Sequence, residues 1–266
     1  MDCVLWALSR LETRSGTGLL NTFKTNSNEL GDTLSCSSTP LKHMIAMKDT
    51  ELPQDIKWFN AVVLMIMAWV TLVAIEPWTA WQMDPQSHGY GWNRFSYFTI
   101  QSNMIATATY VIAAVAILRK KQLGEWFRYL RAAAVLYMIV TGVVFAVLLR
   151  DTAVDTDPNH FNWSNFILHE FGPFFITVWW LLWPSKKPIT AANSFYLLIF
   201  PLIWVIYTFV RAAITGWYPY PFLDPDVSGG IAGVSCYVLA ITIFFLFLCQ
   251  LLAWISCARE NNNTLY

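Results

Sequence analysis

Charged residues are scarce in this sequence. Asp, Glu, Lys and Arg make up 13% of the 266 residues, and their formal charges sum to zero, whereas a soluble domain carries about 25% charged residues. Such a low charge content argues against a soluble globular fold. A protein that binds nucleic acid needs a basic surface, and a chain without net charge offers none, so we expect no nucleic-acid partner.

Ligands for a metal ion or a haem are scarce as well. The five cysteines are odd in number and lack the Cys-x-x-Cys spacing that is typical of structural zinc sites. Of the four histidines, only His169 lies within an apolar run, so the sequence lacks a facing pair of axial histidines for a haem. We therefore predict neither a metal site nor a cofactor.

The chain is instead rich in long apolar runs. Each is close to the roughly 17–25 residues that cross a bilayer as a helix. The loops between them are rich in Pro, Gly, Trp and Tyr, which is typical of interfacial loops and aromatic belts. The runs cover 58–75, 98–118, 132–149, 166–183, 195–213 and 231–255. They predict an all-α polytopic membrane protein, a bundle of six transmembrane helices.

The two ends of the chain differ from the apolar part. Residues 1–55 are rich in Ser, Thr, Asn and Gly without a sustained hydrophobic period, and they lack the basic start, apolar middle and cleavage site of a signal peptide. We expect a disordered N-terminal tail at 1–55, a six-helix transmembrane domain at 56–257 and a C-terminal tail at 258–266.

The basic residues predict the orientation of the bundle. Of the 17 Lys and Arg residues, all but Arg94, Arg150 and Arg211 lie before the first run, in the even-numbered connections or after the last run. Because cytoplasmic loops carry an excess of Lys and Arg, we predict that both termini face the cytoplasm. The outer loops are then those at 76–97, 150–165 and 214–230.

The predicted localisation is integral to a membrane, with several spans. In a bacterium this is the plasma membrane, and in a eukaryote it is the plasma membrane or an endomembrane. The sequence does not indicate an oligomeric state.

Polar residues that a membrane helix normally avoids gather at the predicted outer side. They form three pairs with a spacing of four residues, which places each pair on one face of its helix. The pairs are Thr99 with Asn103, Asn165 with His169, and Tyr207 with Arg211, and the loop GWYPYPFLDPD adds Tyr220 and Asp224. Because polar groups at membrane depth usually face a bundle interior or a cavity, we predict that these residues form a site.

Four of these residues also have a structural interpretation. A threonine in a membrane helix commonly bonds the carbonyl four residues earlier or packs against a neighbour, as Thr99 would. Arg211 would extend its charge to the interface, and Asp224 would cap a turn. His169 would serve as an interhelical hydrogen-bond donor.

Three motifs occur in order along the chain, YFTIQSN, NFILHEFGP and RAAITGWYPYPFLDP. With them, residues 58–255 resemble the androgen-inducible membrane hydrolase family and its microbial six-span branch. The resemblance implies a six-helix membrane fold. From the characterised animal members it also implies cleavage of fatty acid esters of hydroxy fatty acids by a membrane-embedded Thr and His.

By motif, the catalytic pair of that family falls on Thr99 and His169. The spacing from His169 to Pro173 is that of the microbial branch and differs from the animal one. The resemblance therefore implies the fold more directly than the substrate. The expected partners are the bilayer and a lipid substrate.

The implied chemistry is consistent with the residue types. A threonine hydroxyl is a weak nucleophile and needs a base, and an imidazole suits that task at neutral pH. The attacked carbonyl develops negative charge and needs a donor. The candidate donors are Asn103, Arg211 and Tyr220. Asn165 and Asp224 are the options for orienting His169. Asn165, Tyr207 and Asp224 complete the predicted substrate-binding set.

Two other functions remain open. The first is a non-enzymatic multi-pass protein or transporter whose polar cluster binds a lipid or small amphiphile, although the chain shows no inverted repeat and its polar residues gather at one end. The second is a metal hydrolase that uses His169, Glu170 and Asp224, which lack a recognisable ligand spacing.

Overall fold

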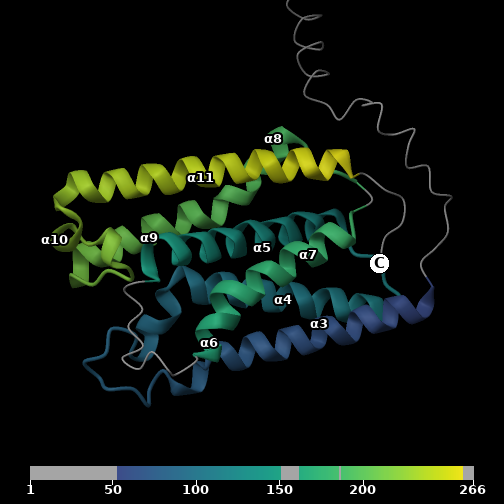
Figure 1. Ribbon diagram of the computed structural model, residues 1–266, viewed down its shortest axis with the longest axis horizontal. Coiled ribbons are helices and arrows are strands. Elements are labelled where there is room, and N and C mark those ends of the chain that lie inside the picture. The colour runs from purple at the N-terminus through teal and green to yellow at the C-terminus, as the bar shows by residue number, and fades with distance from the viewer. Residues whose placement is uncertain (1–52, 151–161, 186, 260–266) are drawn as a thin grey trace, which may run out of the picture.

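The computed structural model describes residues 53–150, 162–185 and 187–259. Within these ranges the chain is helical and contains no strand, which confirms the all-α prediction. The long helices run side by side along the long axis of the molecule (Figure 1). Most of the expected tails at 1–55 and 258–266 lies outside the described residues, although the first described helix begins at Gln54 and the last ends at Ala258.

Five helices of the described part are long and apolar enough to cross a membrane. Their cores are α3 (Gln54–Ile75), α4 (Phe98–Leu118), α5 (Glu125–Val144), α9 (Ile199–Thr215) and α11 (Gly230–Ala258). A π-helical turn, Phe145–Leu149, extends α5, and the short α8 (Ala191–Ser194) precedes α9. Five of the six expected runs are thus helices of membrane-spanning length.

The sixth expected run is a helix with an interruption. The short α6 (Trp163–Phe166) continues through a π-helical turn, Ile167–Phe171, into α7 (Gly172–Leu182). His169 and Glu170 stand in that turn and make the segment less apolar than the other five. A sixth membrane crossing and the cytoplasmic position of the termini stay predictions.

Helices α3, α4, α5 and α7 pack closely together. Helix α4 lies between α3 and α5, and α7 lies against α5. Small residues make this possible, because they let helix backbones approach: Ala61, Ala106 and Ala134 are fully buried. At Gly142 of α5, an added Cβ would stand 2.9 Å from the carbonyl oxygen of His169, so only glycine fits this crossing.

Helix α5 begins at Glu125, earlier than the apolar run at 132–149 suggests. Arg131 therefore lies inside the helix at 1% exposure. Its Nη2 donates to Oγ of Ser185 at 3.0 Å, and its guanidinium lies 5.2 Å from the ring centroid of Trp179. Partners on and just after α7 thus accommodate this buried charge.

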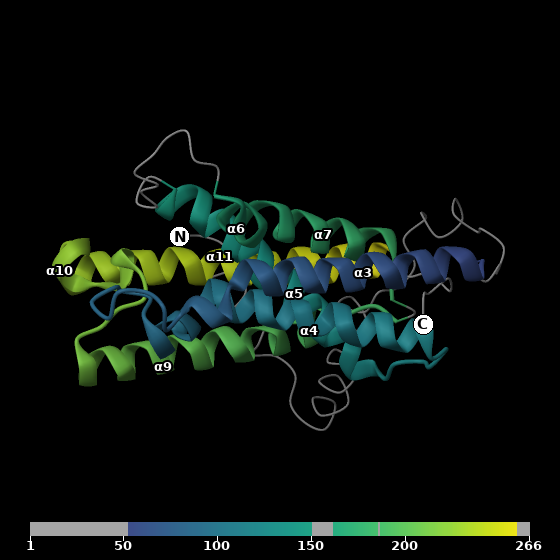
Figure 2. The same ribbon diagram turned by 90° about the horizontal axis from the view of Figure 1, so that it is seen from below.

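The chain turns at two ends of the bundle. We call one of them the site end: there α3, α5 and α9 end, and α4, α6 and α11 begin (Figure 1). At this end the loop before α4 contacts the loop before α11, where Nε2 of His88 lies 2.6 Å from the carbonyl oxygen of Tyr218. Figure 2 shows α7 and α9 on opposite sides of the bundle.

Candidate functional site

A cavity of about 670 Å³ lies at the site end. The first turn of α4, the π-helical turn Ile167–Phe171 and the loops before α4 and α11 form its wall. We call it the polar cavity, because hydroxyl, amide, imidazole and guanidinium residues line it. Among these are Thr99, Asn165, His169, Tyr220 and Asp224, which the sequence predicts as site residues.

Thr99 stands in the first turn of α4, where backbone N–H groups lack a partner within the helix. The N-cap residue of the helix is Tyr97, whose side chain makes no cap hydrogen bond. Tyr220 supplies the missing partner: its hydroxyl accepts from the Thr99 N–H at 3.1 Å and lies 3.2 Å from Oγ1 of Thr99. These two bonds hold Thr99 at the wall of the cavity, where it is 8% exposed.

The Tyr220 hydroxyl is protonated at neutral pH, because burial raises its pKa above the ordinary tyrosine value. Its oxygen already accepts from the Thr99 N–H, so its proton is available for Oγ1 of Thr99. The hydrogen of the Thr99 hydroxyl is then free for another acceptor. Within the described residues Oγ1 bonds no helix carbonyl, so the first structural interpretation of Thr99, a bond to the carbonyl four residues earlier, does not apply.

His169 is held from two sides in the π-helical turn. Its Nδ1 lies 3.1 Å from the carbonyl oxygen of Asn165. Since a carbonyl only accepts, Nδ1 carries the hydrogen and Nε2 keeps a lone pair. The ring also stacks on Phe145 with a centroid distance of 4.1 Å. Asn165 therefore orients His169, through its backbone and not through its side chain.

Thr99 and His169 line the same cavity but are not hydrogen-bonded to each other in the described part of the chain. A base can act through one bridging water, and catalytic hydrogen bonds often tighten only when substrate binds. The arrangement can therefore accommodate a reacting group between a hydroxyl and the lone pair of an imidazole nitrogen.

Asn103, expected as a donor to substrate, is fully buried behind the cavity wall. Its Nδ2 donates to the carbonyl oxygens of Thr99 at 2.9 Å and Leu168 at 3.2 Å, so both of its hydrogens are engaged. In a π-helical register the Leu168 carbonyl would accept from residue 173, but Pro173 has no N–H. Asn103 replaces that donor and ties the turn that carries His169 to α4.

Tyr207 and Arg211 lie together on α9, outside the polar cavity. The Tyr207 hydroxyl lies 3.0 Å from Oγ of Ser96, to which Arg211 donates at 2.7 Å. Arg211 also donates to Oδ1 of Asn93 and lies over the ring of Trp217, 4.1 Å from its centroid. These contacts fasten the site end of α9 to the segment before α4. A role in substrate binding stays a prediction for both residues.

Asp224 combines its structural role with a place on the cavity wall. Its Oδ1 accepts from the N–H of Asp226 at 2.9 Å and caps α10 (Pro225–Ser228). Glu170 forms an ion pair with Arg150 at 3.0 Å. Among the described residues, no three His, Cys, Asp or Glu side chains lie close enough to hold a metal ion. His169, Glu170 and Asp224 therefore do not form a metal site.

Sequence reasoning missed His88, Arg94 and Tyr97, which also line the polar cavity. His88 stacks on Trp217 with a centroid distance of 5.0 Å and bonds the carbonyl of Tyr218. Its partners are about 130 positions away, and no local spacing could have linked them. For Tyr97, its place in the motif YFTIQSN, two positions before the threonine, was a usable signal.

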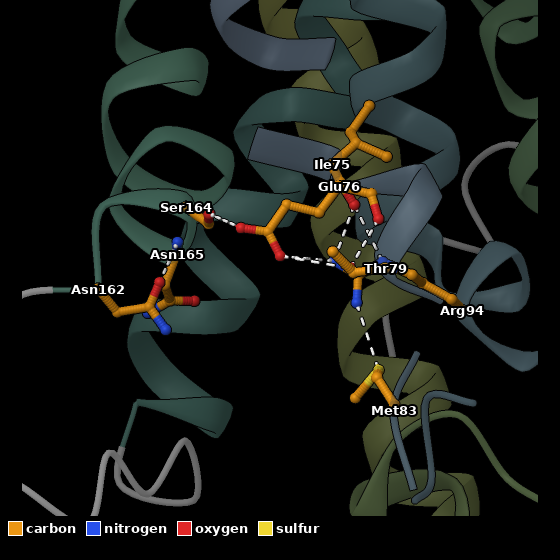
Figure 3. A network of polar contacts seen from close by, with 8 residues as sticks. All are labelled: Ile75, Glu76, Thr79, Met83, Arg94, Asn162, Ser164 and Asn165. Carbon is orange, nitrogen blue, oxygen red and sulfur yellow. Dashed lines mark hydrogen bonds and ion pairs between the residues drawn. The ribbon is translucent and has the colours of Figure 1, made fainter. Parts of the chain in front are cut away.

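A polar network joins the end of α3 to the start of α6 (Figure 3). Glu76 follows α3 with a left-handed backbone (φ 49°), and its Oε1 accepts from Ser164 at 2.7 Å. Arg94 pairs with Glu76 at 3.7 Å and donates to the Ile75 carbonyl at 3.0 and 2.8 Å, a favourable place for a cation at a helix C-terminus. The network thereby fixes the start of the segment that carries the π-helical turn.

A second cavity, of about 280 Å³, lies between α5, α9 and α11. We call it the apolar cavity, because aliphatic and aromatic residues form nearly all of its wall. Thr99, Leu149 and Tyr220 line both cavities. Thr99 therefore stands where a polar cavity meets an apolar one.

Comparisons of the chain with protein-family models, with curated proteins and with solved structures found no match. The resemblance of the three motifs to the androgen-inducible membrane hydrolases therefore stays a hypothesis. The function has to be inferred from the chemistry of the two cavities.

Proposed function

We propose that the protein is an integral membrane hydrolase that cleaves a fatty acid ester with Thr99 as nucleophile and His169 as base. The observation that carries the proposal is the position of Thr99 at the junction of the two cavities. An ester with an acyl chain on one side and a polar part on the other matches this junction. The resemblance of the three motifs to a family of lipid ester hydrolases supports the same reaction.

In the proposed reaction, Oγ1 of Thr99 attacks the ester carbonyl carbon, and its proton passes to Nε2 of His169. The tetrahedral intermediate collapses, the alcohol leaves with that proton, and the acyl group stays on Thr99. A water molecule, deprotonated by Nε2, then hydrolyses the acyl-enzyme and releases the fatty acid. The Asn165 carbonyl keeps the hydrogen on Nδ1 throughout.

The oxyanion that forms on the attacked carbonyl needs a donor, and we assign this role to Tyr97. Tyr97 lines the polar cavity, and its hydroxyl has no hydrogen-bond partner among the described residues. Burial raises its pKa, so the hydroxyl keeps its proton at neutral pH. The three donors expected from the sequence, Asn103, Arg211 and Tyr220, are already engaged by other groups.

A second candidate function is the binding of a lipid or small amphiphile without chemistry. One observation favours it: among the described residues, Thr99 is hydrogen-bonded to Tyr220 and not to His169. A binding protein needs the same two cavities but no proton transfer between these residues. The two functions therefore differ in the effect of removing the Thr99 hydroxyl, which would leave binding intact and abolish cleavage.

The proposal includes six membrane crossings with both termini in the cytoplasm, so that the site end faces the exterior or a lumen. The distribution of Lys and Arg supports it. Single cysteines in a cysteine-free background test it. We expect a cysteine at Ser87 or Ser228 to react with an impermeant reagent from outside, and one at Gln122 to react only after permeabilisation. The reverse pattern would overturn the orientation.

The enzymatic proposal is tested with purified protein and a panel of fatty acid esters that differ in chain length and alcohol. Thr99→Ala and His169→Ala should each lose cleavage by several orders of magnitude, because they remove the nucleophile and its base. Thr109→Ala is the matched control. Thr109 is a buried threonine of the same helix whose hydroxyl, among the described residues, bonds only the carbonyl of Ile105 at 2.8 Å. Its loss should leave the rate nearly unchanged. Equal rates in all three variants would exclude Thr99–His169 catalysis.

A further inference from the structure

The apolar cavity lies between two helices that face the bilayer in the proposed topology. Helix α9 contributes Leu202 and Val205, helix α11 contributes Ile241 and Leu246, and α5 contributes Val140. Two of these residues are also exposed on the surface of the bundle, Leu202 at 59% and Leu246 at 38%. The cavity is therefore open on the side where α9 and α11 meet the lipid.

The polar groups along this cavity are already satisfied by the protein. The hydroxyl of Thr242 donates to the carbonyl of Val238 at 2.7 Å, and Thr141 bonds Ser102 at 2.8 Å. The Trp204 ring N–H donates to the Ser96 carbonyl at 3.0 Å. A guest in the cavity therefore meets an apolar wall, which stays dry in water and favours apolar occupants.

The exception lies at the inner end of the cavity, where Thr99 and Tyr220 stand. Their hydroxyls share one hydrogen bond, and the Thr99 hydrogen is free for a further partner. Behind them the polar cavity begins. A matching guest is therefore apolar along its whole length and polar at one end only.

We propose that the apolar cavity binds a single unbranched acyl chain, which enters from the bilayer between α9 and α11 and places its carbonyl at Thr99. The inference rests on the proposed function for the role of that carbonyl, but the binding itself needs no catalysis. The polar remainder of the lipid then occupies the polar cavity. Val205 of α9 and Ile241 of α11, which both line the cavity, would limit the length or bulk of the chain.

The probe for this inference is a sixteen-carbon fatty acid N-alkyl amide with a photoreactive diazirine at mid-chain, added to the protein in lipid nanodiscs. An amide in place of the ester prevents turnover. We expect mass spectrometry to find the label on the cavity-facing residues of α9 and α11, in the wild type and in Thr99→Ala alike. Excess unlabelled fatty amide should suppress the label. Label only on outward-facing residues would mean contact with bulk lipid and would overturn the proposal.

Two pairs of variants sharpen the test. Ile241→Trp and Val205→Trp fill the cavity and should lose most of the labelling. Their controls are Ile243→Trp and Ile206→Trp, which add the same bulk at positions 57% and 55% exposed on the outer faces of the same helices. The controls should label as the wild type does. Equal labelling of both sets would contradict the inference.

The two proposals can fail separately. If the label enters the cavity but no ester is cleaved, the acyl-chain site stands and the hydrolase assignment falls. If esters are cleaved but Ile241→Trp leaves both the labelling and the chain-length preference unchanged, the hydrolase assignment stands and the chain lies elsewhere.

Discussion

The two sides of the bundle are packed very differently. In α4 and α5, 56% of the most apolar stretch is buried, whereas the share is 22% in α9 and 28% in α11. On the first side, hydrogen bonds between side chains connect neighbouring helices. Examples are Trp179 Nε1 to Asn60 Oδ1 at 3.3 Å and Ser102 to Thr141 at 2.8 Å. The second side encloses the apolar cavity.

Under the proposed function, the two sides have different tasks. In the proposed reaction, a rigid group of helices holds Thr99 and His169 in place, since small misplacements of catalytic groups cost large factors in rate. A loosely covered side would admit the proposed lipid chain. The predictions below test each half of that comparison, beginning with the largest expected effect.

The same truncation should cost much more stability on the first side than on the second. Leu64→Ala in α3 removes a fully buried side chain and should cost about 2–5 kcal/mol of stability, because it leaves a cavity in a close-packed core. Leu202→Ala in α9, at 59% exposure, should change stability by less than about 0.5 kcal/mol. Thermal unfolding in one detergent measures both. Similar losses would mean that the two sides are equally rigid.

Tyr97 lies directly before α4 and lines the polar cavity, and its loss should affect catalysis and not folding. Tyr97→Phe keeps the ring and removes the assigned oxyanion donor, so kcat should fall about 10²–10³-fold with KM nearly unchanged. Tyr90→Phe, in the same loop but away from both cavities, is the control. A wild-type kcat in Tyr97→Phe would remove Tyr97 from the mechanism.

Asn103 connects α4 to the π-helical turn, and we expect its replacement to loosen His169. Asn103→Leu leaves the Leu168 carbonyl without its donor and should cost about 1–3 kcal/mol of stability. Because the π-helical turn positions the base, kcat should also fall, and the lower limb of the pH–rate profile should shift as the histidine environment changes. An unchanged pH profile with reduced stability would make Asn103 a packing residue only.

The smallest effect is expected at Arg211. Arg211→Lys keeps the charge but loses the bonds to Ser96 and Asn93 and the stacking on Trp217, so stability should fall by about 0.5–1.5 kcal/mol. KM should not change, because Arg211 does not line either cavity. A raised KM for carboxylate-bearing lipids would instead place Arg211 in substrate binding.

Hydropathy was sufficient to find five helices that are long and apolar enough to cross a membrane, because the bilayer imposes length and composition on any helix that crosses it. It placed the start of α5 too late, since Arg128 and Arg131 interrupt the apolar run and the partners of Arg131 lie on a distant segment. The π-helical turn could not be predicted from the sequence either. Pro173 signals a disturbance, but only the distant Asn103 shows how the freed carbonyl is satisfied.

The candidate site was predictable to the extent that its residues project from one end of the bundle. Spacing by four picked out Thr99, Asn165 and His169, and the specific loop motif supplied Tyr220 and Asp224, all of which line the polar cavity. Spacing could not show that Tyr207 and Arg211 bind the segment before α4 or that His88 closes the cavity. Those facts depend on contacts between residues more than a hundred positions apart.

The most direct test of the central claim is the covalent state of Thr99. A fluorophosphonate probe that reacts with activated hydroxyl groups should modify the wild-type protein, and peptide mapping should place the adduct on Oγ1 of Thr99. Thr99→Ala and His169→Ala should remain unmodified, whereas Thr109→Ala should react like the wild type. A folded wild-type protein without an adduct on Thr99, or equal modification of Thr99→Ala, would contradict the claim that Thr99 is a nucleophile.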